Sequence, residues 1–361
     1  MKQRNVMIEI WRLIFSFLIV ICHTVELPWY SPEVRVTRST SIGVEFFFII
    51  SGYLMAKSAS TPPPLNFWSD IRGFLFKKLK TIYPTYLFAL VLGNVAELLL
   101  PRVAEEVNLL DYVYFLWDVL FLRATGLRGE SLKSAVPASW YLSAMILAMA
   151  LLYPLIRKFY DAFQTMIAPL LSVFILGWFA QMYKGCGVAF TFKNGICLGL
   201  LRGISEICVG CVCFSVAQWL KGKQLERPIR FLATVAEEGA FCAVVAISYF
   251  FGRSYMDYIS IFLIAVGVSL SFSGITFTSR LSEKLQLRWV GSFSLALYLT
   301  HLKWAQILGR WKIPIPFRSQ IWILLALSVA SALACVYTLE LITRLYRAHK
   351  ERKLQVTVRS E

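Results

Sequence analysis

Charged residues are scarce in this sequence, and acidic residues are fewer than basic ones. Of its 361 residues, 16% are charged and 58% are hydrophobic, and the mean hydropathy is +0.63. A soluble globular protein is about half apolar and about a quarter charged. The composition therefore excludes a soluble globular fold, a disordered chain, a coiled coil and a small disulfide scaffold. It indicates a protein whose solvent is lipid.

Apolar runs recur along nearly the whole chain. A hydrocarbon core about 30 Å thick needs roughly 20 mainly apolar residues in a helix. Continuous runs favour helices, because barrel strands would alternate apolar and polar residues. We predict an all-α integral membrane protein, a bundle of about ten transmembrane helices. The predicted spans are 8–27, 42–57, 82–100, 137–156, 166–183, 197–220, 231–251, 257–275, 289–309 and 321–343.

The sequence also lacks a visible soluble domain, an internal repeat and a signal-peptide cleavage site. Because no small-x-small site follows the first apolar segment, that segment is predicted to remain as a helix. The missing repeat disfavours an inverted-repeat transporter. We expect a single membrane domain over residues 1–361, with a basic cytoplasmic tail at 344–361.

The positive charge is unevenly divided between the two sides of the predicted bundle. The formal net charge is +16. With the N-terminus inside, the cytoplasmic segments carry nearly twice as many Lys and Arg residues as the opposite face. Because cytoplasmic loops are enriched in these residues, both termini are predicted to be cytoplasmic. The same bias explains the basicity without a nucleic-acid partner, and the expected location is a bacterial cytoplasmic membrane.

The cysteines show no metal-ligand spacing. Cys208, Cys211 and Cys213 share one apolar span with no nearby His, which favours core packing over a metal site. Cys186 and Cys197 flank a predicted outer loop and could form a disulfide. We therefore predict no metal site.

The first span carries the clearest polar constellation. Arg12 and His23 are eleven residues apart, so on a helix they share one face and lie about 16 Å apart along the axis. Glu26, three residues further on, shares a similar face and could orient or charge-stabilise His23. Ionisable residues within a membrane usually face a bundle interior or a watered cavity. This face is therefore the first candidate for a functional site.

The second span carries a carboxylate at about the same depth in the membrane as His23. Glu45 lies near the predicted outer end of that span, so it could approach His23 and orient it as a general base. Alternatively, Glu45 could cap its helix and His23 could bond to backbone.

Two other spans carry weaker candidates. Arg202 and Glu206 are spaced to neutralise each other, and His301 could face the bundle while Lys303 extends outward to the interface.

Five sequence features together resemble the membrane acyltransferase-3 family. Their order and spacing, with about ten spans, agree with that family over nearly the full chain. The features are Arg12-x10-His23, IGVEFFFIISGYL at 42–54, a Lys-rich stretch running into IYP at 82–84, SWYL at 139–142 and VGSFSLALYLTHL at 290–302.

The resemblance implies an enzyme that moves an acyl group, usually acetyl, from cytoplasmic acyl-CoA to a hydroxyl of an envelope glycan or glycolipid. By this resemblance His23 is the catalytic base, Arg12 is the cation nearer CoA, and Glu45 is the family's acid before its FF pair. Acyl-CoA is then a donor co-substrate, and no tightly bound cofactor is expected. A hydroxyl could attack directly, or Ser51 or Cys22 could form a covalent intermediate.

The basic stretch stands where the family carries an Arg/Lys-rich segment. Lys77, Lys78 and Lys80 are therefore candidate contacts to the CoA phosphates, although the family often has two arginines there. The same lysines could instead be topology anchors. The remaining candidate substrate contacts are Glu26, Trp140, Arg202 and His301.

Two other functions fit the same residues. A transporter or flippase would line its path with His23, Glu45 and Arg202, and would work without acyl-CoA. A membrane module could bind or deliver a small molecule for a partner, since resemblance does not guarantee catalysis. The identity of the acceptor, the acyl chain and the oligomeric state are not encoded in any motif of the sequence.

Overall fold

The fold is a helical bundle, as the sequence predicts. The computed structural model describes residues 5–27, 42–62, 66–98, 115–126, 134–187, 191–281, 288–311 and 314–360. Of the residues described, 85% are helical. Its one small sheet in the described residues pairs β1 (Phe192–Lys193) with β2 (Ile196–Cys197) in antiparallel register.

The described residues contain short turns as well as long helices. Three short 3-10 turns are η1 (His23–Glu26), η3 (Arg123–Thr125) and η4 (Pro137–Ser139), and η5 (Phe163–Ile167) is a π-helical turn. The α-helices are α1 (Val6–Cys22), α2 (Ile42–Ala59), α3 (Phe67–Leu98), α5 (Trp140–Lys158), α6 (Tyr160–Ala162), α7 (Ala168–Tyr183), α8 (Leu198–Leu220), α9 (Arg227–Phe250), α10 (Met256–Ser273), α11 (Thr278–Leu281), α12 (Arg288–Trp311) and α13 (Phe317–Ser360).

Within the described part of the chain, eight helical segments are long and apolar enough to cross a membrane. They are Val6–Glu26, Ile42–Ala59, Pro137–Lys158, Tyr160–Tyr183, Leu198–Leu220, Arg227–Phe250, Met256–Ser273 and Phe317–Glu351. Each overlaps one of the ten predicted spans. The other two predictions, 82–100 and 289–309, fall on α3 and α12, whose polar residues keep them out of this set; residues 99–100 lie outside the described ranges.

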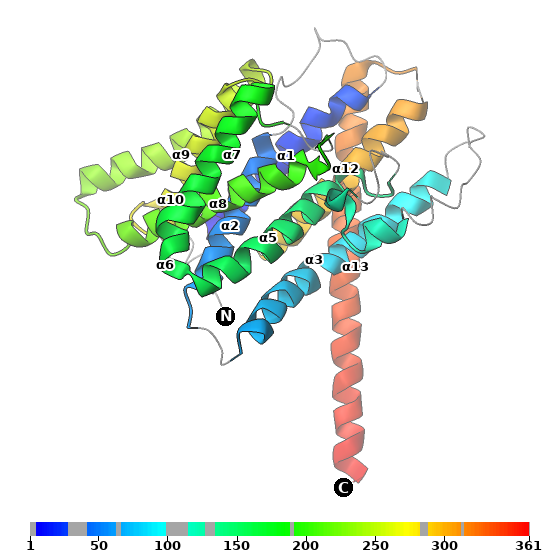
Figure 1. Ribbon diagram of the computed structural model, residues 1–361. Helices are drawn as coiled ribbons and strands as arrows, with labels where there is room; N and C mark the ends of the chain where they lie inside the picture. The colour runs from blue at the N-terminus through cyan, green and yellow to red at the C-terminus, as the bar shows by residue number, and fades with distance from the viewer. Residues whose placement is uncertain are drawn as a thin grey trace.

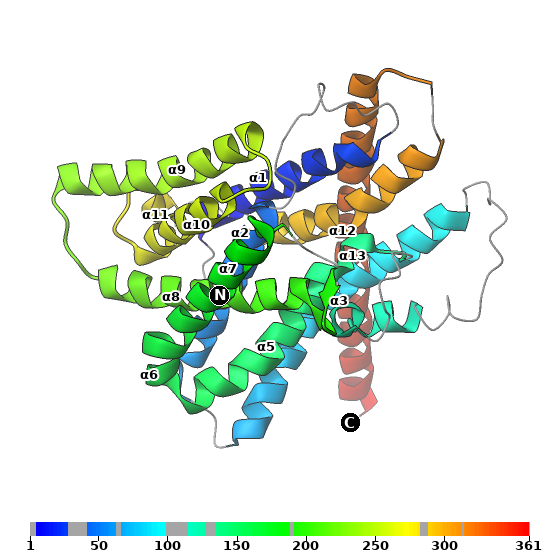
Figure 2. The same ribbon diagram turned by 45° about the horizontal axis from the view of Figure 1, so that its top comes forward.

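Two parallel helices, α1 and α12, form the part of the bundle that carries two candidate histidines, His23 directly after α1 and His301 on α12 (Figures 1 and 2). Phe17 packs on Phe293 at a ring separation of 6.5 Å, and nine residues further along the chain the backbone of Glu26 lies against Gly309. Because corresponding residues meet in the same order along both helices, the helices run in one direction. A residue near the end of α1 therefore faces the second half of α12.

Helices α2 and α8 make the most extensive helix contact among the described residues. A Cβ added to Gly52 would lie 2.0 Å from the carbonyl oxygen of Ile207, and one added to Gly210 would lie 2.0 Å from that of Ile49. The two backbones can approach this closely only because both positions are glycine. Small residues at helix crossings are typical of membrane bundles. This crossing fixes the register between α2 and α8.

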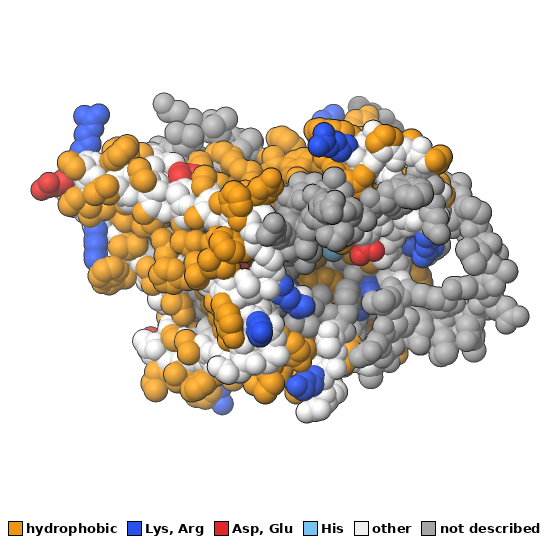
Figure 3. Space-filling view, turned by 90° about the horizontal axis from the view of Figure 1, so that it is seen from above, with side chains coloured by type: hydrophobic (Ala, Val, Ile, Leu, Met, Phe, Trp, Pro, Cys, Tyr) orange, Lys and Arg blue, Asp and Glu red, His pale blue; other side chains and the backbone are white. Residues whose placement is uncertain are grey.

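Apolar side chains cover the outer faces of the bundle. Phe174 on α7 is 70% exposed and Phe262 on α10 is 66% exposed. In the view from above, hydrophobic side chains dominate the part of the surface where α7, α8, α9 and α10 lie (Figure 3). Because lipid is as apolar as these side chains, such exposure is expected of a membrane-facing surface.

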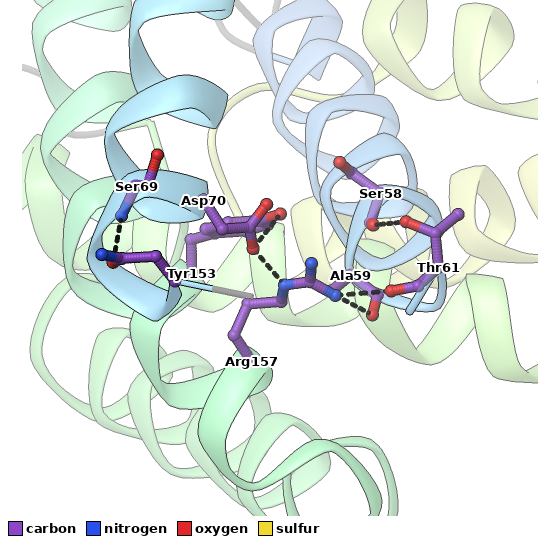
Figure 4. Close-up of polar contacts among 8 residues, drawn as sticks. Ser58, Ala59, Thr61, Ser69, Asp70, Tyr153 and Arg157 are labelled. Atoms are coloured by element: carbon purple, nitrogen blue, oxygen red, sulfur yellow. Dashed lines mark hydrogen bonds and ion pairs between the residues drawn. The ribbon is translucent and has the colours of Figure 1, made fainter. Parts of the chain in front are cut away.

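An arginine ties three helices together at one end of the bundle (Figure 4). Arg157, near the end of α5, bonds through Nε to Asp70 of α3, and its Nη1 donates to the carbonyl oxygens of Ala59 at 2.9 Å and Thr61 at 2.6 Å. These contacts satisfy the carbonyl groups left free where α2 ends. The charge of Arg157 is thus used to hold the ends of helices.

Two features lie away from the centre. Helix α13 continues well beyond the bundle (Figure 1). Cys186 and Cys197 are both free thiols, so the disulfide considered from the sequence is not formed. Cys208, Cys211 and Cys213 are buried at 0–1% exposure, as predicted for core packing.

Candidate functional site

His23 lies beside a second histidine. The α-helix ends at Cys22, and His23 begins the 3-10 turn η1, with its side chain half-buried. Its ring centre is 5.1 Å from that of His301, and the two ring planes are inclined by 47°. Parallel packing of α1 and α12 brings these rings together. The sequence identified both histidines as candidates but did not predict the pair.

His301 is held firmly and fully buried. Its Nδ1 lies 2.6 Å from the carbonyl oxygen of Tyr298 and 3.2 Å from that of Leu297, and the residue is 0% exposed. Its Nε2 has no hydrogen-bond partner among the described residues. A buried ring nitrogen without a partner is costly, because it has lost its water without replacement.

A row of aromatic rings leads away from this histidine pair. His301 packs on Tyr298 at 5.8 Å between ring centres, and Tyr298 packs on Tyr141 at 5.5 Å. Phe47 touches both tyrosines, at 6.3 Å from each. These residues come from α2, α5 and α12, so the row lies inside the bundle.

The far end of this row is basic. Arg12 lies close enough to Tyr141 of α5 and Lys78 of α3 for its charge to act on both. Arg12 Nη1 donates to both carboxylate oxygens of Glu9 at 2.9 Å. Arg12 and Lys78 therefore bring two cations close together at this level. The Arg12 side chain remains 18% exposed, so an anion can still reach it.

The three candidate lysines differ in their surroundings. Lys78 is half-buried, and burial together with the charge of Arg12 lowers its pKa to about 8. Lys77 and Lys80 are exposed. Only Lys78 therefore adds its charge to the cluster around Arg12, and the other two lie on the outer surface of α3.

Glu45 lies against a different partner from the one predicted. Its Oε1 is 2.6 Å from Arg202 Nη2, and both side chains are 1% exposed. The predicted approach of Glu45 to His23 is therefore wrong in this structure. The reason is the glycine-mediated crossing of α2 and α8, which sets Glu45 opposite Arg202.

Arg202 is the centre of a closed buried cluster. The predicted pairing with Glu206 is present, with Arg202 Nε 3.0 Å from Glu206 Oε1. The guanidinium also lies over the ring of Trp140, at 5.6 Å from its centre. Asp257 of α10 is within electrostatic reach of both glutamates. Because Glu45 and Arg202 are paired and buried, they do not form the open path that the transporter hypothesis requires.

Of the remaining candidate residues, Glu26 is accessible to solvent and Lys303 is buried. Glu26 is exposed, and because side chains three apart eclipse in a 3-10 turn, it lies on the same side as His23. Lys303 is only 7% exposed, so its predicted extension to the interface is wrong. Helix α12 is packed against α1, α3 and α13, which leaves Lys303 inside the bundle.

The two possible nucleophiles are also buried. Ser51 Oγ donates to the sulfur of Met145 at 3.2 Å, and a thioether cannot take up a proton. Cys22 is 3% exposed. This setting does not activate Ser51 as a nucleophile.

Four residues of these clusters were missed by sequence reasoning. Tyr298 lies in the motif that contains His301, one helical turn before it, and Tyr141 lies in SWYL, so both carried a signal. Glu9 is three residues before Arg12, a spacing that allows a helical ion pair. For Asp257 the sequence offered no signal beyond its position at the start of an apolar span. Its contact with the Arg202 cluster depends on tertiary packing.

Comparison with known proteins adds one match. Residues 5–340 match the family model of acyltransferase-3, which is described as an acyltransferase domain. No curated protein and no solved structure matches the chain. The matched range contains every candidate site residue.

Proposed function

The chain belongs to the acyltransferase-3 family, and from this premise we propose that it transfers an acyl group from acyl-CoA to a hydroxyl of an envelope glycan or glycolipid, with His23 as the general base. The observation that carries the proposal is the row of side chains from Arg12 to His23. It joins a basic cluster to a half-buried histidine through the interior of the bundle.

The basic end of this row of side chains suits the binding of acyl-CoA, the proposed acyl donor. Acyl-CoA carries several phosphate charges, and arginine and lysine bind phosphate through charge-assisted hydrogen bonds. Arg12, which is paired with Glu9, and Lys78 supply two neighbouring cations for an anion. Lys77 and Lys80 would extend the same field at the surface.

The extended arm of acyl-CoA would follow the aromatic row. Phe47, Tyr141 and Tyr298 offer it apolar faces, and the thioester would then lie near His23. Arg12 and His23 are eleven residues apart on one helix, a rise of about 16 Å. An elongated donor bound along this rise can keep its phosphates at one end and its reacting carbonyl at the other.

His23 would act on the acceptor. Its half-buried ring accepts the proton of the acceptor hydroxyl as that oxygen attacks the thioester carbonyl. The new C–O bond forms, the C–S bond breaks, and the departing thiolate takes the proton back from His23. No covalent enzyme intermediate is needed, which agrees with the inert setting of Ser51.

The donor is proposed to be cytoplasmic acetyl-CoA, and the enzyme a multipass protein of a bacterial cytoplasmic membrane with both termini inside. The excess of Lys and Arg on the inner segments supports this orientation. In that orientation Arg12 lies nearer the cytoplasm and His23 nearer the outer face.

The test uses the purified full chain in proteoliposomes with radiolabelled acetyl-CoA. Lipopolysaccharide, capsular polysaccharide and peptidoglycan are offered as acceptors to the wild type and to His23→Ala. We expect label transfer by the wild type, none by His23→Ala, and acetyl-CoA binding by both. Transfer by a folded His23→Ala protein at the wild-type rate would refute the role of His23. Absence of acetyl-CoA binding by the wild type would refute the donor.

A further inference from the structure

The hydrogen-bond partners of His301 determine which of its ring nitrogens carries hydrogen. Nδ1 lies within hydrogen-bond distance of the carbonyl oxygens of Leu297 and Tyr298. Carbonyl oxygens accept hydrogen bonds and never donate them. Nδ1 of His301 must therefore be the donor, and in the neutral ring Nε2 keeps its lone pair.

That lone pair is buried and unused within the described residues. His301 is 0% exposed, so water does not reach Nε2 in place of a protein donor. Leaving a buried acceptor unsatisfied costs about 1–3 kcal/mol. A group kept at such a cost calls for a donor close by.

The neighbouring donor is the ring of His23. The ring centres are 5.1 Å apart, but the two rings are not hydrogen-bonded as they stand in the structure. The bond requires the half-buried His23 ring to turn toward His301 Nε2. The two histidines also differ in access. His23 is half-buried at the end of its helix, whereas His301 lies fully buried behind it. A substrate hydroxyl can reach His23 and cannot reach His301.

We infer that His301 is the positioning residue of His23, accepting at Nε2 a hydrogen bond from one nitrogen of the His23 ring. This bond fixes the tautomer of His23, so that its other nitrogen keeps the lone pair that takes the acceptor proton. The inference rests on the proposed function, in which His23 is the base. His301 thus takes the orienting role that the sequence had suggested for Glu45.

A neutral orienting group fits this location. A carboxylate in the place of His301 would be an ionised group in a fully buried position, where an unpaired charge is costly. The Nδ1 hydrogen bonds to α12 hold the His301 ring in place without any charge. During transfer the hydroxyl proton moves to His23 and returns to the leaving thiolate, and His301 neither gains nor loses a proton.

The test compares two substitutions of His301 in the full chain. His301→Phe keeps a planar ring and removes the acceptor, whereas His301→Gln restores an acceptor as an amide oxygen. Both are assayed in proteoliposomes with radiolabelled acetyl-CoA, and acetyl-CoA binding and thermal stability are measured alongside. We expect His301→Phe to lower kcat about 10- to 100-fold with unchanged acetyl-CoA binding, and His301→Gln to recover most of that loss.

The outcomes separate the inference from the proposed function. If the wild type transfers label, His23→Ala does not, and a folded His301→Phe protein keeps the wild-type kcat, the inference fails and the proposed function stands. If His301→Gln is as impaired as His301→Phe, the acceptor role also fails. If the wild type transfers nothing, both fail. Should the variants not fold, nitrogen-15 NMR of histidine-labelled wild type decides: Nδ1–H with a hydrogen-bonded Nε2 at His301 supports the inference, and Nε2–H overturns it.

Discussion

The Arg202 cluster and the histidine pair are both polar groups between helices, yet they differ in charge and in access from solvent. Arg202 pairs with Glu45 at 2.6 Å and with Glu206 at 3.0 Å, and all three side chains are at most 1% exposed. The histidine pair keeps a half-buried ring and an unpartnered nitrogen. Ionic contacts shut off from solvent hold helices together, whereas an accessible ring beside a buried lone pair is suited to chemistry.

The largest effect is expected from breaking the closed cluster. Arg202→Met leaves two carboxylates buried without their cation, which should lower the free energy of unfolding by about 3–5 kcal/mol. Unfolding in mixed detergent micelles measures it. The matched control is Arg344→Met, which removes another arginine paired four residues along a helix, but an exposed one. That control should show no change in stability, and equal losses in both variants would contradict the comparison.

The next largest effect is expected on transfer activity when His23 is replaced. His23→Gln removes the base without changing any ion pair, so transfer should fall by about 10²- to 10⁴-fold while stability stays near that of the wild type. Single-turnover transfer of radiolabelled acetyl groups measures it. His349→Gln, in the exposed part of α13, is the matched control and should remain fully active. A large loss of stability in His23→Gln would show that the histidine is structural.

A smaller effect is expected from the crossing that sets Glu45 opposite Arg202. In Gly52→Ala the new Cβ would meet the backbone of Ile207, and backbone cannot rotate away as a side chain can. The helices must separate, which should cost about 1–3 kcal/mol of stability. Gly177→Ala in α7 meets nothing within 4 Å and should be neutral or stabilising. Thermal unfolding of both variants tests this, and a neutral Gly52→Ala would contradict the close crossing.

The smallest effect is a pH dependence of donor binding. Because burial and Arg12 lower the pKa of Lys78 to about 8, its positive charge is present below that pH and is lost as the pH rises through it. Acetyl-CoA affinity should therefore weaken severalfold between about pH 7 and pH 9. Lys78→Gln should bind more weakly at pH 7 and lose this pH step. Lys350→Gln, in the exposed tail, should keep it; a step that persists in Lys78→Gln would assign it to another group.

The sequence predicted what depends on local periodicity and hydropathy. Lipid forces spanning segments into helices, so the eight apolar spans were readable, and the shared face of Arg12 and His23 follows from helix geometry. The contact between Glu45 and Arg202 was not readable, because it depends on the register of α2 and α8. That register follows from a close approach at Gly52 and Gly210, which nothing near Glu45 encodes.

The histidine pair was missed for the same reason. His23 and His301 were each visible as ionisable residues in apolar segments, but their contact requires α1 and α12 to run in parallel side by side. The burial of Lys303 depends on the same packing. Single-residue chemistry was therefore predictable, whereas the assignment of partners required the folded bundle.

The most direct test of the account compares His23→Gln with Glu45→Gln at a temperature where both proteins remain folded. Transfer of label from radiolabelled acetyl-CoA is measured for each in proteoliposomes. The account predicts that Glu45→Gln loses stability but transfers label at a rate near that of the wild type, whereas His23→Gln is stable and inactive. Inactive Glu45→Gln together with active His23→Gln would contradict the assignment of catalysis to the histidine pair.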